Sequence, residues 1–132
     1  MNNTTLTGRL TRDPEVRHNT GANGKLSVAK YTLAVRRPRA KEGQPNADFI
    51  RCTAFGPKAT FAENYLAKGM KIEVSGNIRT GSYVNKAGQT VYTTELLVND
   101  QEFAETMQKN AEIFAHSTEN QHDFGDAELP FE

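Results

Sequence analysis

Residues 48–56 read DFIRCTAFG, and this stretch governs how the rest of the chain is interpreted. Side chains of a β-strand alternate between its two faces. One face would carry the small or apolar side chains of Ile50, Cys52 and Ala54. The other would carry Phe49, Arg51, Thr53 and Phe55. The first face suits a hydrophobic core. The second fits either another packing layer or a flat, negatively charged ligand with a π-face, such as single-stranded nucleic acid.

The length of 132 residues favours one domain with a tail. The single cysteine, Cys52, leaves no intramolecular disulfide, and its place among small apolar residues predicts a buried, unreactive thiol. The first residues lack a basic, apolar leader, and no run approaches the roughly 18 apolar residues of a membrane span. We therefore expect a soluble protein in a reducing compartment, with no membrane contact.

The net charge of zero hides an uneven distribution. Residues 1–103 hold 15 Lys and Arg against 9 Asp and Glu, whereas residues 104–132 hold one lysine against 7 acidic residues. The basic part is expected to be one folded domain. The acidic part has too few apolar residues to fold alone, and it is expected to be a flexible linker with an acidic tip.

Three further stretches alternate as strands do: residues 3–10, 25–37 and 71–80. A fifth strand is expected at residues 90–99, and its apolar character on both faces near the end suggests cover by another subunit. Residues 16–18 are compatible with a resumed extended path. Residues 85–88, Asn-Lys-Ala-Gly, predict a hairpin tip.

One helix of about ten residues is predicted between the third and fourth strands. Pro57 suits its first turn, and Gly69 is expected to stop it. Phe61 and Tyr65 lie four residues apart and are expected in the core. The order β-β-β-α-β-β predicts an all-β chain: an OB-fold, which is a five-stranded Greek-key barrel, followed by the acidic tail.

Several separated motifs resemble the bacterial and phage single-stranded DNA-binding proteins, the SSB family. They are LTGRLTRDPEVR at 6–17, YTLAV at 31–35, AFG at 54–56, ENYLAKG at 63–69, GNIRT at 76–80 and YTTE at 92–95. The resemblance implies an OB-fold that assembles as a homotetramer. It also implies sequence-independent binding of single-stranded DNA in replication, recombination and repair, in the bacterial cytoplasm or nucleoid.

The family's base-stacking aromatics would fall on Phe49, Phe55 and Tyr83, and the alternation alone already places the first two on the outward face. The chain has no tryptophan, a residue that the family often has at the first and third of these positions. Phosphates would be neutralised by a set drawn from Arg9, Lys30, Arg36, Arg37, Arg39, Arg51, Lys71, Arg79 and Lys86. Arg36, Arg51 and Arg79 are favoured, because each lies on an outward strand face beside a stacking candidate or another cation.

The end of the chain is similar to the family's acidic tip, which docks onto replication and repair proteins. The matching residues are Asp126, Glu128, Leu129, Pro130 and Phe131. The tip keeps a second hypothesis open: an OB-fold accessory of replication or recombination that acts mainly as a protein-interaction module.

An enzyme, such as an OB-fold nuclease, is the third hypothesis, and the sequence disfavours it. His18 lies beside a turn, while His116 and His122 fall in the expected tail. No His, Cys and carboxylate cluster has the spacing of metal ligands, and no set of nucleophile, base and orienting group is apparent. We therefore expect no catalytic residue, no metal and no cofactor.

Overall fold

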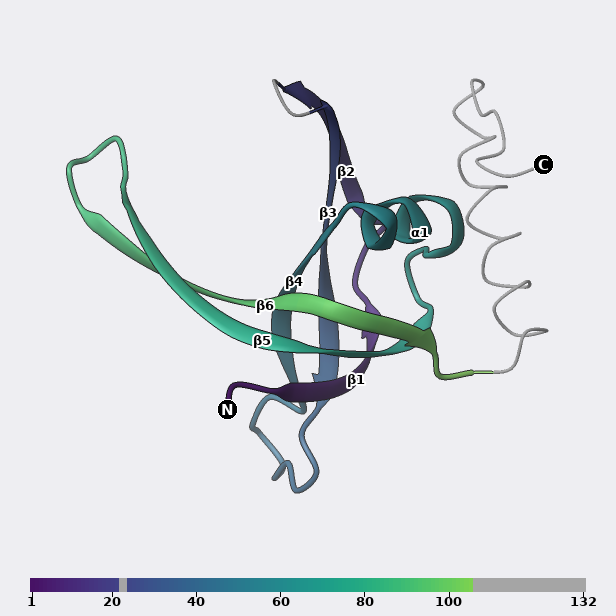
Figure 1. Ribbon diagram of the computed structural model, residues 1–132. Helices are drawn as coiled ribbons and strands as arrows, with labels where there is room; N and C mark the ends of the chain where they lie inside the picture. Colours follow the sequence, from purple (N-terminus) through teal and green to yellow (C-terminus); the bar gives the residue numbers. More distant parts are fainter. Residues whose placement is uncertain (22–23, 106–132) are drawn as a thin grey trace, which may run out of the picture.

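A computed structural model describes residues 1–21 and 24–105. Its elements are β1 (Thr4–Leu10), β2 (Glu15–Gly21), β3 (Gly24–Arg36), β4 (Ala47–Phe55), α1 (Pro57–Tyr65), β5 (Lys71–Val84) and β6 (Thr90–Phe103). Figure 1 shows the strands wrapped around one another, with α1 beside one end of the barrel. No helix within this part of the chain is long and apolar enough to cross a membrane.

The strands form one sheet in the order β1-β5-β6-β4-β3-β2, and an extra pairing of β1 with β3 closes it. The closed ring contains five strands and a helix between the third and fourth of them, which confirms the predicted OB-fold. The structure adds β2, because the segment expected only to resume an extended path is a full strand. β2 pairs with the first half of β3 and lies outside the ring.

Two short seams close the barrel. β1 meets β3 through two residue pairs, and β4 meets β6 through two pairs, Cys52 with Leu96 and Thr53 with Leu97. Next to the second seam, β5 runs so close to β6 that a Cβ added at Gly76 would lie 1.9 Å from the carbonyl oxygen of Leu97. A shift in register between β5 and β6 also falls at this glycine. The β5–β6 pairing beside this seam therefore requires a glycine at position 76.

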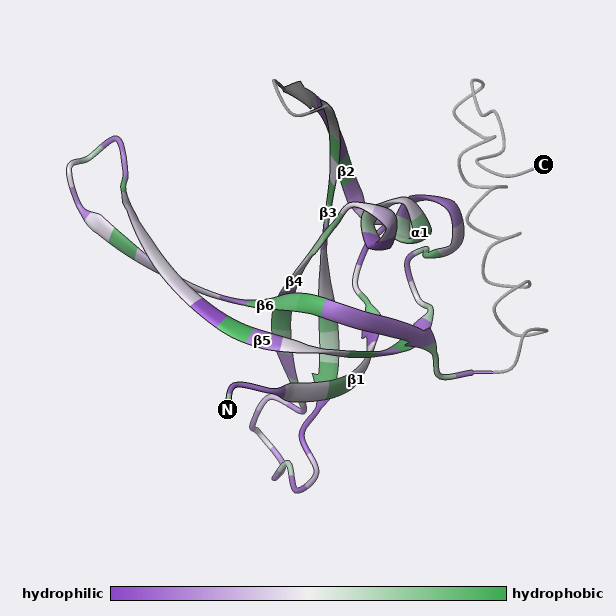
Figure 2. Ribbon diagram, in the orientation of Figure 1, coloured by the Kyte–Doolittle hydropathy of each residue, from purple (hydrophilic) through white to green (hydrophobic). Residues whose placement is uncertain are grey.

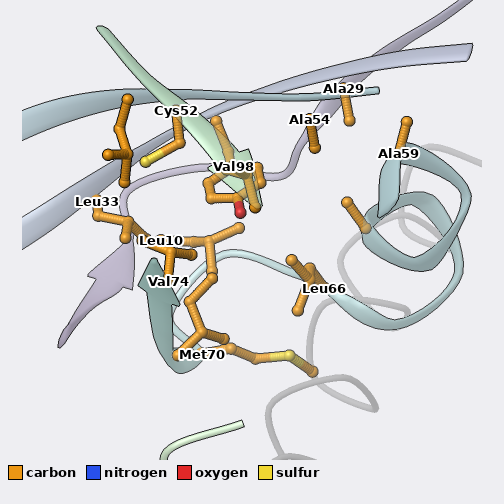
Figure 3. Packing of buried hydrophobic residues seen from close by; sticks show 14 of the residues in the cluster. Leu10, Ala29, Leu33, Cys52, Ala54, Ala59, Leu66, Met70, Val74 and Val98 are labelled. Atoms are coloured by element: carbon orange, nitrogen blue, oxygen red, sulfur yellow. The ribbon is translucent and has the colours of Figure 1, made fainter. Parts of the chain in front are cut away.

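The core fills the ring with the inward side chains that the alternation predicts. Leu33, Ile72 and Leu96 are fully buried, and Cys52 is a free, buried thiol, as expected. Figure 3 shows these strand residues meeting the side chains that α1 and the following turn contribute, Ala59 and Leu66 among them. Burial raises the pKa of the Cys52 thiol to about 12.

The helix begins as predicted but ends earlier. Gly56 takes a φ of 64° before Pro57, and the helix ends at Tyr65, after which Leu66 is extended. Gly69 has a φ of 92°, but it lies in the later turn that leads to β5, so its expected role as the helix stop is wrong. Tyr65 is 51% exposed, although its ring contacts that of Phe61 at 5.2 Å between centroids, so it does not belong to the core.

Two ribbons project from the barrel (Figure 1). The β2–β3 arm consists of residues 18–21 of β2 and residues 24–27 of β3, because residues 28–30 also pair with β4. The β5–β6 arm consists of residues 80–84 and 90–94, which pair only with each other. The turn at its end is the predicted hairpin tip, where the side-chain oxygen of Asn85 accepts hydrogen bonds from the backbone of Ala87 and Gln89. Both strands of this arm run further than the sequence predicts.

Ile78, at the base of the β5–β6 arm, was expected to face the core, but it is partly exposed. It lies where β5 leaves the barrel, so its inward-facing side has only part of a core to contact. The side chain of Asn2 pairs with both the N–H and the C=O of Ile78, at 3.0 and 2.8 Å, two positions beyond the last pair of the β1–β5 ladder. Figure 2 shows hydrophobic residues gathered on the barrel strands, while the end of β6 is hydrophilic.

Candidate nucleic-acid interface

The outward face of β4 carries two exposed aromatic rings with an arginine between them. Phe49 is 68% exposed, Arg51 is exposed, and Phe55 is 36% exposed. Thr53 shares this face but is only 3% exposed, because its hydroxyl donates a 2.9 Å hydrogen bond to Glu95 of β6. Of the two readings that the sequence left open, a second packing layer therefore applies to Thr53 alone among these four.

The neighbouring strand β3 widens this face. Antiparallel pairing places Thr32 opposite Arg51, Lys30 opposite Thr53 and Val28 opposite Phe55. Directly opposed residues point to the same side of a sheet. The exposed ammonium group of Lys30 therefore lies between the levels of Arg51 and Phe55.

Three concave regions of about 380, 630 and 160 Å³ follow one another across this face. The first is lined by Phe49, Tyr83 and Tyr92, and it shares Arg51 and Tyr83 with the second. The second shares Lys30 and Glu15 with the third, which reaches Val28 beside Phe55. We name this continuous track, from Phe49 and Tyr83 through Arg51 and Lys30 to Val28, the outer groove. Its two walls are β4 with β3, and the base of the β5–β6 arm.

Tyr83 is the third stacking position, and the structure brings it to the groove from β5. Its side chain is 56% exposed and opposes Val91 of β6. Phe49 and Tyr83 thus line one end of the outer groove from different walls, whereas Phe55 lies at the other end. An unpaired base could contact a ring at either end without displacing a core residue.

The centre of the groove is a charged network. Glu95 accepts hydrogen bonds from Nη2 of Arg79, at 2.7 Å, and from Thr53. Partial burial raises the pKa of Glu95, but the hydrogen bonds from Arg79 and Thr53 and the positive charges of Arg79 and Lys30 outweigh it, so the pKa lies below its usual value. The carboxylate is therefore ionised at neutral pH. Lys30 and Arg51 line the same space.

The other predicted cations are spread around the barrel. Arg9 donates to the carbonyl of Gly69 and forms an ion pair with Glu105, and Lys71 is its partner in the β1–β5 register. Neither lines the outer groove. Lys86 is exposed at the tip of the β5–β6 arm.

Three of the predicted cations lie at the end of β3 and in the loop that follows it. Arg37 is held by Asp48 through its Nη2, at 2.7 Å, and its backbone N–H bonds to Asn46, so this arginine closes the base of the loop. Arg36 and Arg39 are exposed, with no ion pair among the described residues. Neither of these two arginines lines the outer groove.

Arg12, Tyr92 and Glu95 are among the residues that line the groove but are not predicted as site residues from the sequence. Tyr92 is 82% exposed, yet it shares a strand face with Leu96, and the alternation predicts that this face packs in the core. Arg12 precedes the turn to β2, where a cation is ordinary. No feature of the sequence distinguishes Glu95 from the other acidic residues of the domain.

Within residues 1–21 and 24–105, no three His, Cys, Asp or Glu side chains are grouped as metal ligands would be. One hydrogen-bonded series of Ser, His and Glu does occur there. His18 joins Ser27, at 2.8 Å from Nδ1, to Glu63 of α1, at 2.9 Å from Nε2. Ser27 is buried, and its side chain lies on the opposite face of β3 from Lys30, so this series ties the β2–β3 arm to the helix. The predicted tip residues, Asp126 to Phe131, and the histidines at 116 and 122 lie outside the described residues.

A five-stranded closed barrel of this topology, with one helix between its third and fourth ring strands, is an OB-fold, a class of barrels that bind oligonucleotides or oligosaccharides. The chain matches the model of the single-strand binding protein family over residues 1–104. The chain belongs to this family.

Two relatives illustrate the similarity. The single-stranded DNA-binding protein of Clostridium perfringens is 44% identical over 106 residues, which cover 80% of this chain and 67% of that protein. The single-stranded DNA-binding protein 3 of Clostridium acetobutylicum is 40% identical over 131 residues, which cover 98% of this chain and 90% of that protein.

Proposed function

We propose that this protein binds single-stranded DNA along the outer groove, without sequence preference. The observation that carries the proposal is the convergence of Phe49 and Tyr83, both more than half exposed, on a groove that also contains Arg51 and Lys30. Bases would stack on the two rings and on Phe55, each stacked base contributing about 1–3 kcal/mol. The names of the relatives support this ligand, since both are single-stranded DNA-binding proteins.

The exposed rings also explain why the ligand would be single-stranded. In a duplex each base is stacked on its neighbours, so no ring face is offered to a protein aromatic. In a single strand every base has a free face, and stacking does not depend on the sequence. The positive charge alone would attract both forms.

Cations around the groove would supply the phosphate contacts. Lys30 and Arg51 line the groove. Arg36 ends β3, Arg39 lies in the loop that follows, and Lys86 lies in the turn at the tip of the β5–β6 arm, all three exposed. These five cations are the favoured phosphate ligands. Binding would weaken with salt by about 0.7 in log affinity per phosphate for each unit of log salt. Arg9, Arg37 and Arg79 already hold carboxylates, and each would have to exchange one ion pair for another.

Fluorescence anisotropy with a labelled oligo-dT and a matched duplex tests the proposal. We expect tight, salt-dependent binding of the single strand and weak binding of the duplex. Phe49→Ala should lose about 1–3 kcal/mol of oligo-dT binding, which is the contribution of one stacked base. Tyr65→Ala removes another aromatic that is more than half exposed, outside the groove, and serves as the matched control. Equal affinity for both forms, or equal losses in both variants, would argue for a merely basic surface.

We also propose that residues 1–103 form the DNA-binding domain and residues 104–132 a linker with an acidic tip. The tip residues Asp126, Glu128, Leu129, Pro130 and Phe131 would recruit replication and repair proteins. Deleting residues 123–132 should leave oligo-dT binding unchanged or stronger, since an anionic competitor is removed. If the chain acts mainly as a protein-interaction module, its main activity should instead disappear with the tail.

The assembly, biological role and location are part of the same proposal. The protein would act as a homotetramer in replication, recombination and repair, in the cytoplasm or nucleoid of a bacterium, and it would bind DNA without catalysis. The exposed apolar side chains of Ile78, Val84 and Tyr92 support self-association, because they need cover. Sedimentation equilibrium should give four times the chain mass of 14.6 kDa. Incubation of labelled single strands with Mg²⁺ should leave them intact.

A further inference from the structure

An ionised carboxylate in the middle of a groove for a polyanion requires an explanation. Glu95 lines both of the larger concave regions, and its side chain is 24% exposed. It cannot swing away cheaply, because Thr53, which is buried, bonds one carboxylate oxygen at 2.9 Å and Arg79 bonds the other through two nitrogens, at 2.7 and 3.3 Å. The negative charge is therefore fixed on the floor of the groove.

Glu95 also determines what Arg79 can do. The Nε and Nη2 groups of this arginine both point to the carboxylate, so its donors on that side are occupied. A phosphate on the floor would have to displace Glu95 from Arg79, and it would then lie next to the displaced negative charge. Lys30 and Arg51 line the same region, where they can hold a phosphate without displacing this ion pair.

A base meets no such conflict. It is uncharged, its ring stacks on Tyr83 or Phe49 beside the network, and its exocyclic amino groups can donate to a carboxylate. The floor therefore favours bases and disfavours phosphates, whereas Lys30 and Arg51, whose donors have no partner among the described side chains, favour phosphates.

We propose that Glu95 is a specificity-determining residue that keeps phosphates off the floor of the outer groove, so that a bound strand enters with its bases inward and its backbone along Lys30 and Arg51. This inference rests on the proposed DNA-binding function and deepens it. It attributes to this one carboxylate the preference of the groove for strands that carry bases over polyanions without them.

The test compares oligo-dT with an abasic strand of equal length, which has the same phosphates and no bases. Direct anisotropy gives the affinity for labelled oligo-dT, and competition gives the affinity for the abasic strand in the full-length protein at low salt. Their ratio is the base selectivity. Removing one fixed charge from the floor with Glu95→Gln should lower this ratio about tenfold, because the repulsion between two charges within a partly buried site is lost for phosphates only.

Glu102→Gln is the matched control. Glu102 lies on the same strand, opposes Glu73 of β5 and does not line the groove, so the substitution changes the net charge equally. Its base selectivity should equal that of the unaltered protein. Equal ratios in the two variants would overturn the inference, as would failure of the abasic strand to displace oligo-dT from either variant.

A second variant keeps the test decisive if Glu95→Gln proves unstable in a thermal melt. Arg79→Gln changes a half-exposed side chain and leaves the Glu95 charge without its partner. The base selectivity should then rise, whereas a simple loss of one phosphate contact would weaken oligo-dT and the abasic strand alike. Unchanged selectivity in this variant would also overturn the inference. If the unaltered protein did not bind oligo-dT at all, the proposed function itself would be wrong.

Discussion

The two arms that project from the barrel share the same backbone architecture, but they differ in their contacts and in the side chains that they expose. Both are antiparallel ribbons (Figure 1), but the β2–β3 arm is fastened to α1 through His18 and Glu63, and its residues are mostly polar. The β5–β6 arm pairs only within itself among the described strands, and it exposes Tyr83, Val84 and Tyr92. A two-stranded ribbon is marginal on its own. The polar arm is therefore stabilised by its own domain, and the aromatic arm presents a surface that a ligand or another subunit can cover.

The largest effect is expected where the aromatic arm leaves the barrel. Gly76→Ala would place a methyl group 1.9 Å from the Leu97 carbonyl oxygen, and such overpacking against backbone should cost about 3 kcal/mol or more of the free energy of unfolding. Urea denaturation of the two proteins measures the loss. Gly81→Ala, further out on the same strand, meets only the Thr93 hydroxyl at 3.3 Å and should be nearly neutral. Similar midpoints for both variants would show that the arm is not anchored at this glycine.

The next effect concerns DNA binding by the two arms. Tyr83→Ala should weaken oligo-dT binding by about 1–3 kcal/mol, because one stacking ring is removed. Leu26→Ala, which removes an exposed apolar side chain from the β2–β3 arm, should leave binding unchanged. Anisotropy titrations at one salt concentration give both values. A larger loss for Leu26→Ala would reverse the assignment of the arms.

A smaller effect is expected at the fastening of the polar arm. Glu63→Gln removes the charge that faces His18 and should lower the free energy of unfolding by about 0.5 kcal/mol, as for other exposed pairs. Oligo-dT affinity should not change, because His18 points away from the outer groove. Chemical denaturation and anisotropy together check both statements. A change in affinity without a change in stability would mean that this fastening communicates with the groove.

The smallest effect lies in the core between the arms. With its pKa raised to about 12, the Cys52 thiol stays protonated at neutral pH and should not react with a thiol reagent in the folded protein. Because the thiol in the unfolded chain has its ordinary pKa of about 9.0, this group favours folding fully below that pH and loses its contribution as the pH rises towards 12. Labelling with and without denaturant checks the first statement. Rapid labelling of the folded protein at pH 8 would contradict it.

The sequence predicts the ring of strands and one wall of the groove well, because both depend on local alternation. Period two alone places Phe49 outward and Cys52 inward, and both positions are observed. Other features depend on contacts between distant residues. Thr53 is covered only because Glu95 reaches it from another strand, and the register shift at Gly76 follows from its approach to Leu97. Tyr92 shares a strand face with the buried Leu96, so the alternation predicts it in the core. It is exposed because this part of β6 projects from the barrel.

The parallel seam between β4 and β6 has a mechanical consequence. Only two residue pairs hold these strands together, and Thr53 and Glu95, which clamp the seam from outside, form the floor of the outer groove. One of the two narrow joints of the barrel thus lies directly beneath the outer groove. A strand that contacts Arg51 on one wall and Tyr83 on the other would cross this joint, so we expect a bound strand to stiffen the barrel there.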